Sequence, residues 1–417
     1  MGISKQISSN KLWNKNFFLI FLCNTIVMFG NMTLSFALAY YVLDITKSET
    51  IFGLALSATY VSFFLMIPIG GIMADRLKKQ RIMFWIDLST TILIVVYLLI
   101  SGFIISSIAI VFVKLLMINA IQAIYVTTTQ AAIPLIVIEE KLSSGNALMS
   151  MIDPLVTAGG QAMAAFMYVR FGVYPILILF AIIYGGMAIL DLFIDIPYKK
   201  QKSESSILQT INNDMLQAIR FILKDKPIFM KIMIIMFAVN VSVISLLLIG
   251  ILVLITSTLK LDLNMVGISQ FFIAIGALLG GILASLLGAK LTIRKCSLLL
   301  IILSFLPIPM GLVIIFDVTA ILAFVVITVA GTLAMLVNTL ILVALQTFFQ
   351  SETPPEIFGK VIGIIFTLPF LAQAVGQFGL GVIFEEFGNW PWLSIFISVI
   401  ITVGAALYSI NVFRKYK

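Results

Sequence analysis

The stretch GGIMADRLKKQR, residues 70–81, joins an apolar segment directly to a strongly basic one. Its two glycines allow another helix to approach closely. Asp75 and Arg76 end the apolar run, and a cluster of Lys and Arg follows at once. A segment of this kind is typical of a membrane-spanning helix that ends at the lipid surface and continues into a cytoplasmic loop.

The composition of the whole chain agrees with this reading. Of its 417 residues, 61% are hydrophobic and only 11% are charged. A water-soluble protein would have to expose much of that apolar surface to water, whereas lipid can cover it. We therefore expect a membrane protein.

Apolar stretches of roughly 20 residues recur along the chain. An α-helix needs about this length to cross a hydrocarbon core of about 30 Å. These stretches predict an all-α membrane protein with twelve transmembrane helices. The expected spans cover residues 17–43, 51–73, 82–101, 105–131, 146–169, 173–196, 229–257, 265–288, 297–316, 320–348, 360–384 and 391–413. The first is too long, and too closely followed by the second, for a cleaved signal peptide.

The distribution of positive charge predicts the orientation of these spans. An even number of spans places both termini on one side, and all but four of the 26 Lys and Arg lie on that side. Lys47, Arg170 and Lys260 lie opposite, and Lys114 lies inside a span. Because cationic loops stay in the cytoplasm, we expect a cell-membrane protein with both termini cytoplasmic. The net charge of +8 then reflects topology and does not predict nucleic-acid binding.

Several side chains that enzymes depend on are missing. The chain has no His, which excludes His-based metal sites and most hydrolase triads. Its two cysteines, Cys23 and Cys296, predict neither a disulfide framework nor a zinc site. No GxxxxGK[ST] loop occurs, so the chain itself does not hydrolyse ATP. We expect neither enzymatic activity nor a cofactor.

A long polar stretch divides the spans six and six. We expect two six-helix bundles, at 1–198 and 229–417, joined by a cytoplasmic linker at 199–228. The second part of that linker, 211–223, has an apolar face opposite charged residues, which predicts an interfacial helix.

The two bundles are expected to be related copies. A shift of 216 residues aligns polar and glycine positions of the first half with those of the second in the same order. Asn24 aligns with Asn240, and Gly160-Gln161 aligns with Gly376-Gln377. Pseudo-symmetric halves that face each other across a central path are a transporter architecture.

Residues 70–81 resemble the loop signature that follows the second span in the major facilitator superfamily. Gly71, Asp75 and Arg76 match that signature, while Lys78 replaces its later glycine. The resemblance extends over the full length through the span count, the central linker and a weakened second copy at 280–288.

Within the superfamily, the chain most resembles bacterial drug exporters of the macrolide-efflux type. The residues behind this likeness are ADRLKKQRIM from Ala74, IPLIVIEEKLSSGNAL from Ile133 and LQTFFQSETPPEIFGKVIGI from Leu345. The span-five export signature of that group is degraded, with Gly160-Gln161 in place of its Gly-Pro. The resemblance therefore implies export through overall likeness more than through this motif.

The resemblance also implies a gate. Its residues would be Gly71, Asp75, Arg76, Lys79 and Arg81. Asp75 would lie against the N-terminus of span eleven near Gly359, where free amides and the helix dipole favour an anion.

Ionisable groups deep in the membrane cost roughly 2.5 to 3.5 kcal/mol and are candidates for function. Lys114 and Asp153 lie at depths that differ by about 6 Å, so an ion pair between them is within reach. This pair is either architectural, or a coupling device in which Asp153 takes up a proton. Asp87, Asp191 and Asp195 are expected to reach water or loop cations and to be structural.

The resemblance implies that spans one, four, seven and ten line a substrate cavity. The candidate lining residues are Asn24, Asn31, Asn240, Asn338, Phe36, Tyr40, Tyr125 and Phe237. Two other readings stay open: the amides could bond between helices, and the aromatic rings could be ordinary packing.

These observations predict a secondary active transporter, most simply a proton-coupled antiporter that exports an amphipathic drug or natural product and gives antibiotic resistance, for example to a macrolide. We expect a monomer whose partners are a small-molecule substrate, protons and membrane lipid. An uptake permease, or a siderophore or metabolite exporter of the same fold, remains an alternative. A membrane enzyme or a receptor is disfavoured, because neither a reactive cluster at one depth nor a large soluble domain is visible.

Overall fold

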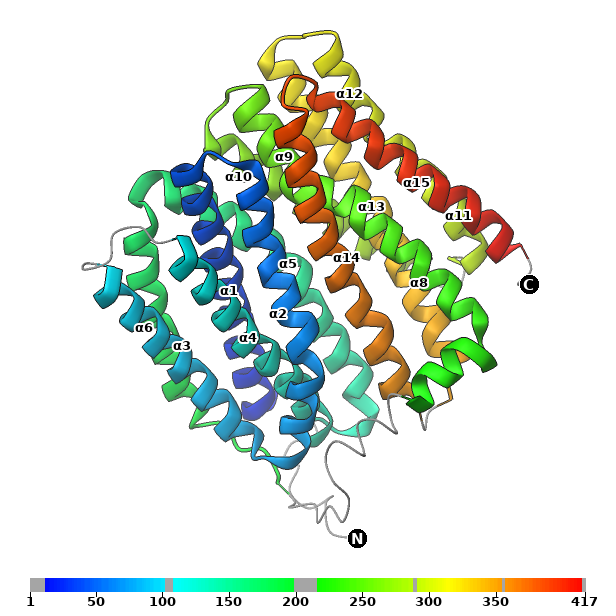
Figure 1. Ribbon diagram of the computed structural model, residues 1–417. Coiled ribbons are helices and arrows are strands. Elements are labelled where there is room, and N and C mark those ends of the chain that lie inside the picture. The colour runs from blue at the N-terminus through cyan, green and yellow to red at the C-terminus, as the bar shows by residue number, and fades with distance from the viewer. Residues whose placement is uncertain (1–11, 102–107, 199–215, 288–290, 355–356, 415–417) are drawn as a thin grey trace. The chain divides into compact units, whose positions relative to one another are not determined.

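The computed structural model describes residues 12–101, 108–198, 216–287, 291–354 and 357–414. Nearly all of these residues are helical, and no strand occurs among them (Figure 1). The chain divides into two compact units. Unit 1 comprises Met1–Asp44 and Val61–Glu204, and unit 2 comprises Ile45–Tyr60 and Ser205–Lys417.

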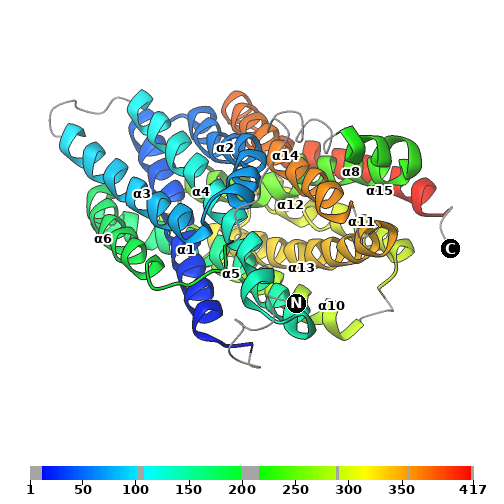
Figure 2. The same cartoon turned by 90° about the horizontal axis from the view of Figure 1, so that it is seen from below.

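Unit 1 is built from helices that precede the linker. They are α1 (Lys15–Thr46), the second part of α2 (Glu49–Arg76), α3 (Lys79–Ser101), α4 (Ile108–Ile136), α5 (Glu139–Phe171) and α6 (Val173–Asp191). Within this unit α3 packs against both α4 and α6, and α5 contacts α4 and α6. The pair α3 and α6 lies side by side in both views (Figure 1 and Figure 2).

Unit 2 contains the first part of α2 and every helix after the linker. These are η1 (Phe221–Asp225), α8 (Pro227–Val239), η2 (Asn240–Ile244), η3 (Leu246–Gly250), α9 (Ile251–Val253), η4 (Leu254–Thr258), α10 (Leu263–Leu287), α11 (Ile293–Phe305), α12 (Ile308–Ile315), α13 (Ala320–Glu352), α14 (Phe358–Glu386) and α15 (Pro391–Phe413). The largest contact in this unit joins α10 to α13, and α15 packs against α8, α11 and α12.

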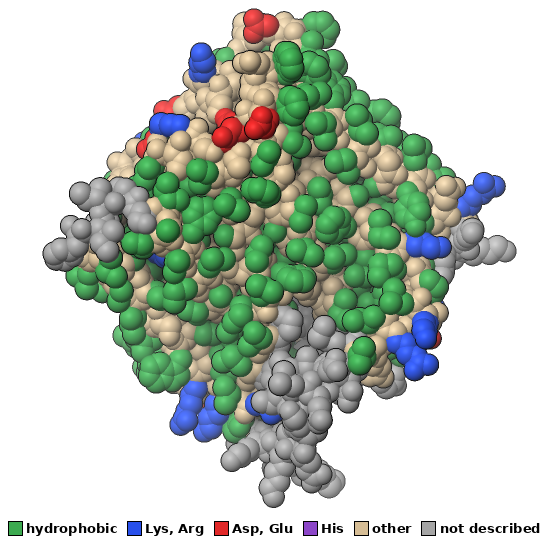
Figure 3. Space-filling model, viewed as in Figure 1, with side chains coloured by type: hydrophobic (Ala, Val, Ile, Leu, Met, Phe, Trp, Pro, Cys, Tyr) green, Lys and Arg blue, Asp and Glu red, His purple; other side chains and the backbone are tan. Residues whose placement is uncertain are grey.

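The predicted all-α membrane fold is confirmed. Eleven helices of the described chain are long and apolar enough to cross a membrane. The expected span at 146–169 corresponds to α5, which is 33 residues long but is not among those eleven. Hydrophobic side chains cover most of the face in Figure 3, and the charged side chains visible there lie toward its margins.

Two expected spans are not single regular helices. The span predicted at 229–257 runs from Pro227 to Thr258 and contains several wider π-helical turns. The span predicted at 297–316 is divided into α11 and α12. Pro307 and Pro309 lie at this break, and because proline has no amide hydrogen and crowds the preceding turn, it interrupts a helix.

Only the second part of the expected interfacial helix lies within the described residues. Residues 216–220 are helical and continue into η1. Ala218, Phe221 and Ile222 are buried, while Ile219 and Leu223 are exposed. Ile219 and Leu223 are four residues apart and therefore lie together on the exposed side of this segment, while Ile222 lies on its buried side.

Glycines allow the close contact between α10 and α13. Gly276 and Gly280 are four residues apart and lie on one side of α10. A Cβ atom on Gly276 would overlap the carbonyl oxygen of Thr332 in α13, and one on Gly280 would overlap that of Leu336. In lipid, the hydrophobic effect does not drive helices together. Small residues spaced four apart instead allow close van der Waals contact between the two helices.

We expect Gly276→Ala to destabilise the protein by about 1–3 kcal/mol, because the added methyl group must push the backbones of α10 and α13 apart. Thermal unfolding in detergent measures the effect. The matched control is Gly281→Ala, since a Cβ on Gly281 meets open space. Equal unfolding temperatures for the two variants would contradict this account of the contact.

Candidate functional site

Polar side chains of α1 and α4 bind one another inside unit 1. The Asn31 amide donates to Asn119 Oδ1 at 3.0 Å, and the Asn119 amide donates to Ser35 Oγ at 3.2 Å. Further along, Thr129 Oγ1 donates to Asn24 Oδ1 at 3.1 Å. Asn24 and Asn31, both proposed as cavity residues, are thus buried in a seam between two helices.

Asn119 is the centre of that seam, and the sequence analysis did not single it out. Its side chain is fully buried and also donates to the Leu115 carbonyl of its own helix. The available signal was an amide within span four, five residues beyond Lys114.

The aromatic candidates of unit 1 are also buried. The rings of Phe36 and Tyr40 on α1 lie 6.2 Å apart, and Tyr40 lies 6.2 Å from Tyr168 on α5. Tyr168 donates to Asp44 at 3.3 Å. Tyr125 on α4 is fully buried, and its hydroxyl has no hydrogen-bond partner among the described residues.

The candidates of unit 2 lie on α8, η2 and α13. Asn240 begins the π-helical η2, where its Oδ1 accepts from Gln373 Nε2 of α14 at 3.2 Å. Its amide donates to the Met236 carbonyl. Asn338 is buried in α13, whereas Phe237 is partly exposed. Asn240 therefore also forms an interhelical bond.

Lys114 is buried in α4 with 5% of its surface exposed. Its ammonium lies 4.0 Å from the centre of the Tyr97 ring on α3 and has no hydrogen-bond partner among the described residues. The aromatic face partly replaces the missing hydration. The Asp153 side chain lies outside the described residues, so the pair with Lys114 stays a prediction.

The loop after α2 is tied to the end of α6. Lys79 Nζ donates to the Ala74 carbonyl and Tyr198 donates to the Arg76 carbonyl, both at 2.8 Å. Gln80 donates to the Leu192 carbonyl at 2.7 Å. These bonds satisfy free carbonyls at helix ends and give the loop one conformation.

The other residues of the predicted gate are Gly71, Arg81 and Asp75. Gly71 has no neighbour that a Cβ atom would meet, and Arg81 is exposed. The Asp75 side chain lies outside the described residues, so its contact with span eleven stays a prediction.

At its other end, α2 is held by α14 within unit 2. Glu385 Oε2 accepts from Ser48 Oγ and from the Thr50 amide, at 2.5 and 2.8 Å. Ser48 Oγ in turn accepts from the Ile51 amide, the usual N-cap arrangement. We call this contact the Glu385 cap.

The two helices run close together behind the Glu385 cap. Gly53 and Gly381 leave no room for a Cβ atom, because each faces a carbonyl oxygen of the other helix. Ser57 donates to the Ala374 carbonyl at 2.7 Å, and the rings of Tyr60 and Phe370 lie 6.3 Å apart. Sequence reasoning identified none of these residues, because the contact is between segments more than 300 positions apart.

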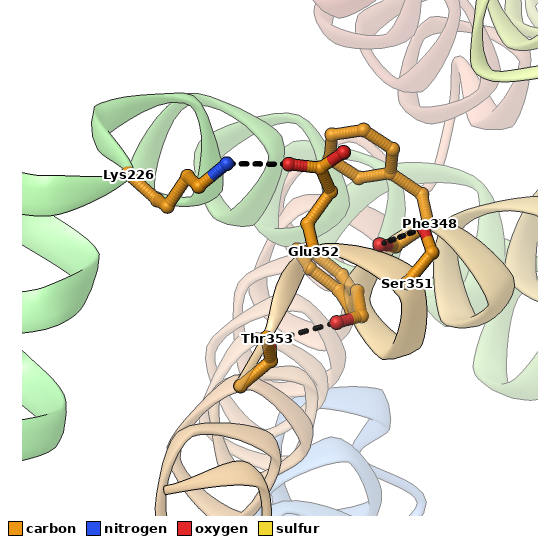
Figure 4. Close-up of polar contacts among 6 residues, drawn as sticks. Lys226, Phe348, Ser351, Glu352 and Thr353 are labelled. Atoms are coloured by element: carbon orange, nitrogen blue, oxygen red, sulfur yellow. Dashed lines mark hydrogen bonds and ion pairs between the residues drawn. The ribbon is translucent and has the colours of Figure 1, made fainter. Parts of the chain in front are cut away.

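An ion pair joins the start of span seven to the end of α13 (Figure 4). Lys226 Nζ lies 2.5 Å from Glu352 Oε2, and each side chain is about one third exposed. The adjacent Thr353 hydroxyl donates to the Phe349 carbonyl, which satisfies part of the helix end. Because water screens it, this pair contributes only about 0–1 kcal/mol.

The expectation for Asp87 and Asp191 is wrong. Both side chains are completely buried, and none of their oxygens has a hydrogen-bond partner among the described residues. They do not reach water as expected, because no part of either side chain is exposed. Instead, Asp87 of α3 interacts with Asp191 of α6. Asp195 is exposed, as predicted, and its amide donates to Asn16.

This arrangement, a helical membrane fold with a basic loop after α2 and polar seams between helices, matches known proteins. The sequence profile of the Major Facilitator Superfamily matches residues 20–377. The chain belongs to this superfamily. No curated protein matches it significantly.

Solved structures share the fold at low sequence identity. An inward-facing, unoccupied bacterial homologue of the human lysosomal transporter Spinster is 13% identical with a TM-score of 0.73, and the match covers 98% of each chain. A mutant of the nucleoside transporter NupG is 15% identical with a TM-score of 0.71, over 94% of this chain and 100% of that one. A mutant of the peptide transporter POT in complex with alafosfalin is 13% identical with a TM-score of 0.73, and the match covers 99% of this chain and 98% of that one.

Membership in the major facilitator superfamily makes this chain a multi-pass membrane transport protein and not an enzyme. Transporters of the superfamily bind small-molecule substrates.

We expect Asn119→Val to lower the free energy of unfolding by about 1–3 kcal/mol, because it leaves Asn31 and Ser35 buried with fewer partners. A thiol-reactive dye reports unfolding here, since both cysteines are buried. Thr347→Val is the control, because Thr347 is exposed and donates only within its own helix. Wild-type stability of Asn119→Val would show that the seam contributes little.

Proposed function

We propose that this protein is a secondary active transporter that exports an amphipathic drug or natural product by proton-coupled antiport. Membership in the superfamily supports transport itself, and the resemblance to macrolide-efflux exporters supports the direction and the chemical class. The observation that carries the mechanism is the Glu385 cap on α2.

Alternating access requires contacts that close one side of the membrane at a time. The Glu385 carboxylate, at the end of α14, binds the N-terminus of α2. In the proposed gate, the Asp75 carboxylate, at the end of α2, binds the N-terminus of α14. In this proposal, each of the two helices ends in an anion that binds the N-terminus of the other helix. The free amides and the helix dipole at an N-terminus favour a bound anion. In this mechanism the two caps form in alternate states.

The charge distribution supports an orientation for these caps. Cytoplasmic termini place the basic loop 76–81 inside the cell and the Glu385 cap outside. The Glu385 cap then closes the outer side, and breaking it opens the transporter outward. The proposed location is the cell membrane, and the proposed active form is a monomer.

Buried aromatic and amide groups suit an amphipathic substrate. Phe36 lies in α1 and Asn338 in α13, each an element that the resemblance implies at the cavity. Aromatic faces accept varied apolar groups, while amides provide a few hydrogen bonds. An uptake permease, or a siderophore or metabolite exporter, would use the same fold and remains the alternative.

A transport assay tests direction and energy source together. We expect cells that express the protein to accumulate less radiolabelled erythromycin than cells that lack it, and a proton uncoupler to remove the difference. Higher accumulation in expressing cells would indicate uptake instead. An unchanged level for erythromycin and for a panel of amphipathic dyes would contradict drug export.

The two caps predict opposite shifts between conformations. Glu385→Gln should open the outer end, and Asp75→Asn should keep it closed, each changing the population ratio by about two- to fivefold. The opening can be measured as the distance between spin labels at Lys47→Cys and Glu386→Cys, which lie beside the Glu385 cap. Cys23 and Cys296 are first replaced by Ser. Both variants should insert normally and transport more slowly.

Asp262→Asn is the control for this experiment, because Asp262 is exposed and, among the described residues, its side chain accepts a hydrogen bond only from the Asn264 amide. Identical distance distributions in all variants would contradict the gating role of the caps. Full transport by Asp75→Asn would exclude that residue from the gate.

A further inference from the structure

Asp87 and Asp191 form a buried pair of carboxyl groups between α3 and α6. Both side chains have no exposed surface, and the two carboxyls interact with each other. None of their four oxygens has a hydrogen-bond partner among the described residues. Helices α3 and α6 pack directly against each other (Figure 2). The buried pair joins these two helices.

The groups around the pair come from α1, α4 and α6. Cys23 of α1 lies beside Asp191, and Tyr125 of α4 interacts with both carboxyls. Tyr184 of α6 lies near Asp87, but its hydroxyl donates to the Val27 carbonyl at 3.0 Å. Tyr125, which is fully buried and lacks a partner in the described structure, is therefore the hydroxyl left for the pair.

No positive charge offsets the two acids. In the described structure, the groups that interact with Asp87 or Asp191 include no Lys or Arg. Asp191 is also the last residue of α6, and the C-terminal end of a helix dipole is unfavourable for an anion. Two adjacent carboxylates cannot both stay ionised in a medium of low dielectric.

A bound cation must therefore complete this site, and a proton suits it best. A metal ion needs several ligands, and no group of three or more His, Cys, Asp or Glu that could hold one occurs among the described residues. Two carboxyls that face one another can instead share one proton, as in the aspartic-protease dyad.

We propose that Asp87 and Asp191 form a proton-binding site in which the two carboxyl groups share one proton. Binding takes one proton from water and forms one O–H bond on a carboxylate oxygen; release returns that proton to water. The Tyr125 hydroxyl, which interacts electrostatically with both carboxyls, is a polar group beside the remaining charge.

The site gives the proposed antiport a place for its coupling ion, and this part of the inference rests on the proposed function. Water that enters beside α1 or α6 would solvate both carboxylates and favour release of the proton. Proton release is then linked to movement of these helices. Proton binding itself does not depend on the substrate or on the direction of transport.

Infrared titration of the purified full-length protein in lipid tests the site without a substrate. We expect a carbonyl-stretching band from a buried protonated carboxyl that disappears as the pH rises, with an amplitude of about one proton per protein. The band should be lost in the double variant Asp87→Asn/Asp191→Asn. In either single variant, the band of the remaining carboxyl should titrate at a different pH.

The matched control is Asp195→Asn, four residues beyond Asp191 and exposed, which should leave the band unchanged. A wild-type band that survives in the double variant, or no titrating band at all, would overturn the proposal. If the variants are poorly folded, the wild-type amplitude still decides, because an amplitude near zero excludes the shared proton. A confirmed band together with failed erythromycin export would keep this site and reject the proposed function.

Discussion

Inside a membrane, a polar group must find its partner within the protein, because lipid offers none. This constraint explains most of the buried polar side chains. Thr90 and Thr128 donate to carbonyls one turn earlier in their own helices, and Ser242 and Thr402 bind each other between η2 and α15. The Asn119 seam between α1 and α4 obeys the same rule. Helix positions thus depend on polar bonds as well as on close packing.

Buried amides without a partner, such as Gln122 and Gln377, occur in both units of the described structure. The carboxyl and ammonium groups that do not obey this constraint are the informative ones. Lys114 has only the Tyr97 ring within the described structure, and Asp87 and Asp191 have each other. Such groups are costly in lipid, which makes function the first interpretation. All three lie in unit 1. Coupling was expected in the N-terminal half, but the structure adds a carboxyl pair different from Lys114 and Asp153.

Glycine positions link the two halves of the chain physically. Gly160 faces Met32 and the Phe29 carbonyl of α1, and Gly376 faces Val241 and Ser245 in unit 2. Ser245 follows Phe29 by the same 216 residues that separate the two glycines. The repeated Gly-Gln therefore preserves a helix contact in each half, which supports the predicted duplication.

The sequence by itself determined the membrane class, the helical fold, the positions of the spans and the resemblance to the superfamily, because lipid imposes length and hydropathy on each segment separately. It could not predict the break at Pro307 within a continuous apolar run, or that Asn24 and Asn31 bind α4. Only the tertiary structure decided which acids meet and which helix ends touch. Asp87 and Asp191 are 104 positions apart, and Ser48 and Glu385 are 337 apart. Such pairings depend on how helices pack, and hydropathy along one chain carries no record of that.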